Sequence, residues 1–206
     1  MKRFAGLSED GLSLWYYTDK ETNEEKTTTT YSTGDFYLCG DPNPDLYGGF
    51  GTSITFHGFD LSTQFSYLVG GLTYDYGYAG MMGNPTATSV GNRWHKDVLK
   101  AWSPENPSST IPRWYFNDLN TTGSSDRFLI DGSYLNLQNI QVGYTLPDSW
   151  TSHLKIKNLR LYFVCDNVYY WSKRKGLDPR RSISGVGTSG KIAPFRTYSG
   201  GISLQF

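Results

Sequence analysis

Apolar and polar residues alternate with a period of two over several stretches of this chain. Between positions 61 and 70 the odd positions include Leu61, Phe65 and Val69, and the even positions include Ser62 and Gln64. A period of two is typical of a β-strand, because successive side chains point to opposite faces of a sheet. Five stretches are predicted to be strands on this basis: 48–57, 59–72, 132–146, 156–171 and 195–206.

The rest of the chain is less regular. Positions 12–16 alternate and predict a strand or hairpin within the first 38 residues, and positions 94–102 are compatible with a short helix. No run of about 18 apolar residues occurs, which excludes a membrane-spanning helix. The first eleven residues lack the apolar core of a secretory signal, so any export signal is expected outside this chain.

The connectors between the predicted strands alternate in length. A tight turn joins the first two strands and a short link follows the third, whereas 73–131 and 172–194 are long. The long connectors therefore emerge at one end of the sheet. Outer-membrane barrels have short periplasmic turns and long extracellular loops, and most of the predicted strands reach the ~9–11 residues that a tilted strand needs to cross a bilayer.

Composition agrees with an all-β chain and excludes some functions. Aromatic residues make up 16% of the chain and the net charge is +0, so no long-range field favours nucleic acid. Cys39 and Cys165 have no metal-ligand spacing and are expected to be free thiols. Five strands are too few to close a barrel, since about eight is the practical minimum. A membrane barrel would therefore need further strands.

Several segments, in order, resemble the SusC/RagA group of TonB-linked outer-membrane proteins. Those segments are Gly40–Phe50, His57–Ser62, Trp102–Pro107 with Pro112 and Arg113, Gly132–Pro147, Leu159–Val168, Gly176–Pro179 and Arg196–Phe206. The resemblance implies an antiparallel transmembrane β-barrel segment, formed by the C-terminal strands of a TonB-dependent transporter, with residues 1–206 lacking the family's plug domain.

The resemblance also implies a function and a set of partners. The whole protein would import glycan or peptide nutrients across the bacterial outer membrane, and the chain would have no catalytic role and no cofactor. The implied partners are a SusD-like surface lipoprotein, TonB acting through a missing N-terminal region, the barrel-assembly machinery and outer-membrane lipid.

Two groups of residues are candidate sites. The last strand carries an alternating face that ends in a C-terminal Phe, which by resemblance is the signal that the assembly machinery reads; otherwise these side chains simply face lipid. Its members are Tyr198, Gly200, Ile202, Leu204 and Phe206. The long connector 73–131 carries aromatic residues that either stack on a ligand or pack the connector's own core. They are Trp94, Trp102, Trp114 and Tyr115.

Other motifs do not predict a site. Positions 185–190 match the glycine pattern of dinucleotide-binding loops, but no buried strand precedes them and Pro194 follows where a helix should run. The histidines at 57, 95 and 153 share no metal-ligand spacing. Asp75, Asp97 and Glu105 are expected to be solvated loop carboxylates rather than a hydrolytic pair. Basic residues are concentrated at 173–181, and their side chains are expected to be solvated.

Two alternatives stay open at this point. A soluble β-sandwich that binds carbohydrate would also show alternation, although the connector 73–131 is long for a sandwich. A secreted β-rich hydrolase is the third class. In a sandwich, Ile202 and Phe206 would point into a dry centre between two layers.

Overall fold

The computed structural model describes residues 1–87, 93–118, 120, 123–151, 156–173, 178 and 194–206. These residues form two compact units. The first, which we call the loop unit, contains Met1–Pro42 and Leu72–Ile130. The second, the sheet unit, contains the described residues of Asn43–Gly71, Asp131–Arg180 and Lys191–Phe206.

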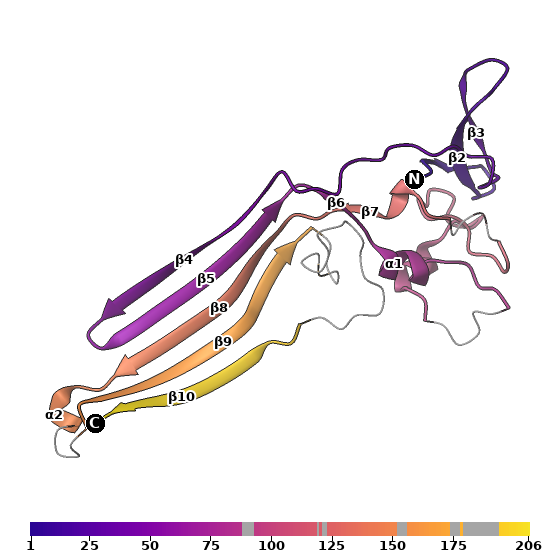
Figure 1. The fold of residues 1–206 in the computed structure, drawn as a ribbon. Coiled ribbons are helices and arrows are strands. Elements are labelled where there is room, and N and C mark those ends of the chain that lie inside the picture. Colours follow the sequence, from indigo (N-terminus) through magenta and orange to yellow (C-terminus); the bar gives the residue numbers. More distant parts are fainter. Residues whose placement is uncertain (88–92, 119, 121–122, 152–155, 174–177, 179–193) are drawn as a thin grey trace. The chain divides into compact units, whose positions relative to one another are not determined.

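The sheet unit is one antiparallel sheet of five long strands (Figure 1). The strands are β4 (Leu46–Phe56), β5 (Phe59–Val69), β8 (Tyr134–Thr145), β9 (Asn158–Ser172) and β10 (Thr197–Gln205), in the spatial order β10-β9-β8-β5-β4. Among the described residues of this unit, no second sheet covers either face. The predicted antiparallel β-class is confirmed, and the two-layer arrangement of a sandwich is absent from the described part of this unit.

The short connectors lie at one end of this sheet. His57 and Gly58 alone join β4 to β5, and a link that contains the short helix α2 (Asp148–Thr151) joins β8 to β9. The C-terminus lies at the same end, beside α2 (Figure 1). Residues 152–155, which complete this link, lie outside the described residues.

The strand register changes once along β8. Opposite β5, Gln138 is an extra residue between the pairs Gln64–Asn139 and Phe65–Leu137. Opposite β9, the same point of β8 faces an irregularity at Asn167, whose φ of 52° is left-handed. A bulge of this kind moves the following side chains to the other face. As a result Leu135 and Leu137, at odd positions, share a face with residues at even positions beyond the bulge.

The loop unit is more structured than the sequence predicted. The first 38 residues, in which a strand or hairpin was expected around positions 12–16, contain a three-stranded sheet of β1 (Phe4–Leu7), β2 (Ser13–Thr18) and β3 (Glu25–Thr28). The connector 73–131 contains helices and most of two short paired strands. These elements are β6 (Leu72–Tyr74), α1 (Tyr76–Met81), the 3-10 helices η1 (Lys96–Lys100) and η2 (Asp126–Phe128), and β7 (Leu129–Asp131). The helix expected at 94–102 is thus a shorter 3-10 helix.

Buried aromatic residues hold the loop unit together. Phe128, which is 3% exposed, packs with Tyr74 and Met82 in the unit's main cluster. Trp15 is 1% exposed and contacts the Tyr31 ring edge-on, with 5.1 Å between centroids.

Cys39 and Cys165 are both free, as predicted. None of the described helices is long and apolar enough to cross a membrane.

Candidate functional site

One face of the five-stranded sheet is apolar and exposed; we call it the apolar face. Directly paired residues of neighbouring strands share a face, so the register assigns its members. One row across the sheet is Ile54, Leu61, Val142, Phe163 and Gly200. Its four apolar side chains are 38–56% exposed, a degree that is unusual for a contiguous patch on a soluble protein.

Aromatic residues form rows near both ends of the apolar face. Near the short connectors, Phe56 pairs with Phe59, whose ring lies 4.4 Å from that of Tyr144. Toward the other end, the rings of Phe50 and Phe65 stack at 4.9 Å. Phe59 and Phe65 are six residues apart, which corresponds to about 20 Å along a strand. Transmembrane barrels have an apolar band of about 25 Å between two aromatic girdles, so the spacing fits a bilayer.

The residues of the predicted terminal signal lie on this face. Tyr198, Gly200, Ile202 and Leu204 pair with Cys165, Phe163, Leu161 and Leu159 of β9. The Tyr198 ring stacks on that of Phe163 at 6.0 Å. Ile202 is 64% exposed and Phe206 73%, so neither points into a dry centre. This exposure removes the main support for the sandwich alternative.

The opposite, polar face carries an ion pair that joins two strands across a third. Arg160 of β9 donates from Nε to Asp60 Oδ1 over 2.9 Å and from Nη2 to Asp60 Oδ2 over 2.5 Å. Asp60 belongs to β5, and β8 lies between β5 and β9. The pair passes over Gly143 of β8, where an added Cβ would lie 2.6 Å from Arg160 Nη2 and closer still to Asp60 Oδ1. A side chain at this position would have to displace the carboxylate and the guanidinium, so Gly143 leaves the space in which the ion pair crosses β8.

A second glycine on the polar face lies beneath an aromatic ring. Gly201 of β10 pairs with Tyr162 of β9. An added Cβ at Gly201 would lie 2.9 Å from Tyr162 Cε1 and would overlap Cζ and the hydroxyl oxygen. The Arg160 guanidinium carbon lies 5.3 Å from the centre of the same ring. The phenol thus lies across the neighbouring strand instead of standing away from the sheet.

Three of the four predicted loop aromatics take part in local packing. Trp94 and Trp114 meet edge-to-face at 5.4 Å, and their indole N–H groups both donate to the Gly83 carbonyl, over 3.1 and 3.2 Å. Trp102 packs against Gly11. Tyr115 is different, because 65% of it is exposed. Of the predicted group, Tyr115 and the 38%-exposed Trp114 are the most exposed, and Trp94 and Trp102 are half-buried.

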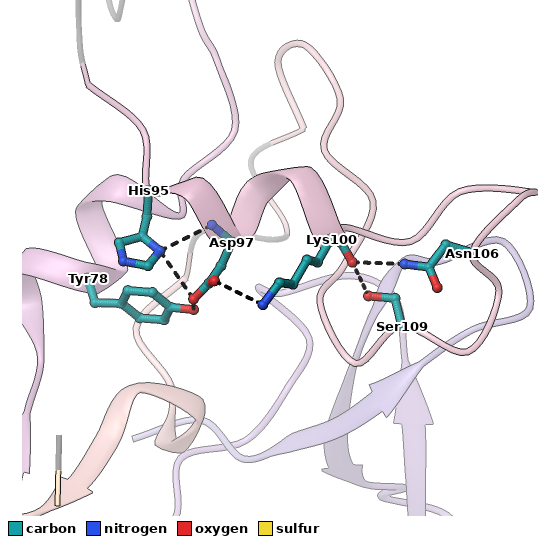
Figure 2. A network of polar contacts seen from close by, with 6 residues as sticks. All are labelled: Tyr78, His95, Asp97, Lys100, Asn106 and Ser109. Carbon is teal, nitrogen blue, oxygen red and sulfur yellow. Dashed lines mark hydrogen bonds and ion pairs between the residues drawn. The ribbon is translucent and has the colours of Figure 1, made fainter. Parts of the chain in front are cut away.

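Of the three loop carboxylates considered for hydrolysis, Glu105 is exposed, as predicted, whereas Asp97 and Asp75 make structural contacts. Asp97 is the centre of the network in Figure 2: its carboxylate accepts from the Tyr78 hydroxyl at 3.0 Å and lies 3.1 Å from His95 Nδ1 and 3.6 Å from Lys100 Nζ. The Tyr78 hydrogen bond, followed by electrostatic interactions with His95 and Lys100, lowers the pKa of Asp97. Asp75 is buried, not solvated as predicted, and caps α1 by accepting from the Tyr78 backbone N–H at 2.9 Å.

An ion pair lies where β8 begins. Lys173 Nζ lies 2.5 Å from Asp131 Oδ2, and the Ser133 backbone N–H donates to Asp131 Oδ1 over 2.8 Å. The Lys173 ammonium, followed by the Ser133 hydroxyl and N–H, lowers the pKa of Asp131 to about 2. Three features noted in the sequence lie outside the described residues. They are the other basic residues of 172–194, the glycine pattern at 185–190 and His153. Among the described residues, no three His, Cys, Asp or Glu side chains form a metal-binding cluster.

Sequence reasoning missed the polar-face contacts. Asp60 is the one charged residue of β5, and Arg160 is the one basic residue of β9. An acidic residue that is alone on its strand and a single basic residue two strands away are a signal for pairing. Their partnership still depends on β8 lying between them with Gly143 at the crossing point, which alternation alone does not reveal.

Curated relatives cover almost the whole chain. TonB-dependent receptor P3 of Formosa agariphila is 30% identical over 98% of this chain and 20% of its own length. TonB-dependent receptor SusC of Bacteroides thetaiotaomicron is 27% identical over 86% of this chain and 17% of its own length. No family model matches the chain.

Solved structures match over the full chain. The structure described as the RagAB peptide transporter superposes with a TM-score of 0.81 at 25% identity, covering 100% of this chain and 22% of that one. The RagAB peptide importer in its open-open state superposes with a TM-score of 0.77 at 26% identity and the same coverage.

These matches confirm the resemblance of the chain to SusC/RagA-type TonB-linked outer-membrane proteins. They also confirm that its antiparallel sheet is of the kind found in a TonB-dependent transporter, although the described strands do not close a barrel. The similar proteins are named as receptors and transporters, not as enzymes. The chain spans about a fifth of the length of the relatives that it matches.

The Asp131 ion pair predicts a pH dependence. Because the folded-state pKa is lowered to about 2, the stabilisation by the carboxylate is fully present above the unfolded pKa of about 3.9 and is lost as the pH falls through about 2. Replacing Lys173 with Gln should raise the Asp131 pKa toward its ordinary value, while the Ser133 donors keep it below that value.

Carbon NMR titration of the Asp carboxyls in detergent-solubilised protein measures this shift. Lys157→Gln is the matched control, because Lys157 is an exposed lysine elsewhere in the sheet unit. An Asp131 pKa that is the same in both variants would contradict the assignment.

Proposed function

We propose that this chain is part of a TonB-dependent importer in the bacterial outer membrane and that it supplies wall strands, outer loops and the C-terminal assembly signal. The observation that carries the proposal is the apolar face. A single-layer sheet exposes large apolar side chains on one face, bordered by aromatic rows, and polar side chains on the other. In the wall of a membrane barrel, the apolar face would contact hydrocarbon and the polar face would line the enclosed interior.

The nutrient is proposed to be a glycan or a peptide. The peptide class is supported by the similarity to the RagAB peptide transporter, and the glycan class by the resemblance to the SusC group. A SusD-like surface lipoprotein, TonB and the barrel-assembly machinery are the proposed partners. The chain contributes no catalytic group and no cofactor to this process.

The accessible loop aromatics are proposed to contact the nutrient or the lipoprotein. Tyr115 is the main candidate, and its neighbour Trp114 contributes part of its ring surface. The Arg113 guanidinium lies 5.5 Å from the centre of the Tyr115 ring and helps to hold it. Trp94 and Trp102 serve the packing that positions this segment.

Nutrient uptake tests the proposed function. The gene for the full-length protein is deleted, and growth is measured on a panel of oligosaccharides and peptides supplied as sole nutrients. The deletion should abolish growth on at least one of them, inactivation of TonB should reproduce the defect, and the restored gene should repair it. Unchanged growth on the whole panel, or recovery of the protein from the soluble fraction, would reject the importer.

Deletion of Phe206 tests the assembly signal. The 73%-exposed C-terminal ring is available to a pocket of the assembly machinery, and an unpaired strand edge can be captured by strand addition. Pulse-chase labelling of the full-length protein should show at least several-fold slower insertion without Phe206. Phe195→Ala is the control, since Phe195 is equally exposed and precedes β10. Undiminished insertion of the Phe206 deletion would refute this role.

A further inference from the structure

The polar face of β10 has one position without a side chain. Alternation places Thr197, Ser199, Gly201, Ser203 and Gln205 on this face, and only Gly201 lacks a Cβ. The Tyr162 ring occupies the space that a side chain at Gly201 would need. The ring and the glycine therefore fit each other in one alignment of β10 against β9.

Alternation alone does not select this alignment. A slip of one residue would send the apolar side chains to the polar face, so alternation excludes it. A slip of two residues preserves both faces, because the pattern repeats every two residues. In the slipped alignments, Ser199 or Ser203 would lie opposite Tyr162. The Cβ of that serine would then clash with the ring, just as an added Cβ at Gly201 would in the native alignment. The polar face thus penalises a slip that alternation alone permits.

The Tyr162 ring is itself held in place. Arg160 packs against the ring at 5.3 Å and is anchored by its two hydrogen bonds to Asp60. That ion pair crosses Gly143, which pairs directly with both Asp60 and Tyr162. The contacts form a continuous belt over four strands, from β5 across β8 and β9 to β10.

We propose that Tyr162 and Gly201 form a register lock that fixes the alignment of the terminal strand. Asp60, Arg160 and Gly143 act through Tyr162, as positioning residues. The inference rests on the proposed function, since β10 is the strand that the assembly machinery would handle. It adds that the final alignment of β10 is set on the polar face, independently of the apolar residues that form the proposed signal.

Cysteine cross-linking in the full-length protein reports the alignment. Val164→Cys with Ser199→Cys joins directly paired positions in the native register, whereas Val164→Cys with Thr197→Cys joins positions that face each other only after a slip of two residues. Cys39 and Cys165 are replaced by Ser, and only molecules recovered from the outer membrane are scored. With Gly201 intact, the native cross-link should be near-complete and the slipped one should stay at background.

Gly201→Ala should give a mixture of native and slipped alignments, and the slipped cross-link should rise at least several-fold above background. Gly200→Ala is the matched control, because a Cβ there has only an ordinary contact, 3.9 Å from the Tyr162 carbonyl. It makes the same chemical change one residue away, and the assembled molecules should keep the native register. If Gly201→Ala keeps the native register as well, the lock is overturned while the importer stands.

Tyr162→Ala covers the case in which Gly201→Ala does not assemble. Removing the ring should give the same mixture with Gly201 intact, and adding Gly201→Ala to Tyr162→Ala should change nothing further. An exclusively native cross-link in Tyr162→Ala would overturn the lock. If the unsubstituted protein does not reach the outer membrane, the proposed function itself fails, and the lock fails with it.

Discussion

The structure depends on the segregation of side chains between the two faces of a single sheet. In each of the five long strands the backbone alternation sends most apolar residues to one face and most hydroxyl, amide and charged residues to the other. No further layer covers the apolar face within the described sheet unit. In water such a face would favour association, whereas in hydrocarbon it is solvated. One edge of β4 and one of β10 have no strand partner among the described residues, and closure of a barrel would pair them.

The polar face determines the register of the strands. Alternation specifies which side of a strand faces which solvent, but it leaves alignments that differ by two residues nearly equivalent. Long side chains that cross bare positions of neighbouring strands remove this ambiguity. The Asp60–Arg160 pair over Gly143 and the Tyr162 ring over Gly201 both use the space left by a glycine. Face selection and register therefore depend on different residues of the same strands.

The sheet could be predicted from the sequence because its signal is local. The alternation of Leu159, Leu161 and Phe163, for example, identifies both the strand and its apolar side. The bulge at Gln138 also leaves a trace, since the apolar residues change from odd positions at Leu137 to even positions at Ile140. The loop unit was less predictable, because its elements are short and Trp15 and Phe128 are buried by contacts far apart in the chain. The same reason applies to Trp94 and Trp114, which meet only after the chain has folded.

The central claim is that the apolar face contacts hydrocarbon, and spin-label accessibility tests it most directly. Ile202 and Ser203 are adjacent in β10 and point to opposite faces, so each is replaced in turn by a labelled cysteine in the full-length protein in lipid bilayers. The account predicts that the label at 202 collides mainly with oxygen, which concentrates in the bilayer, and that the label at 203 is protected from it. Equal oxygen accessibility at both positions, or preferential access of a water-soluble nickel reagent to 202, would contradict the account.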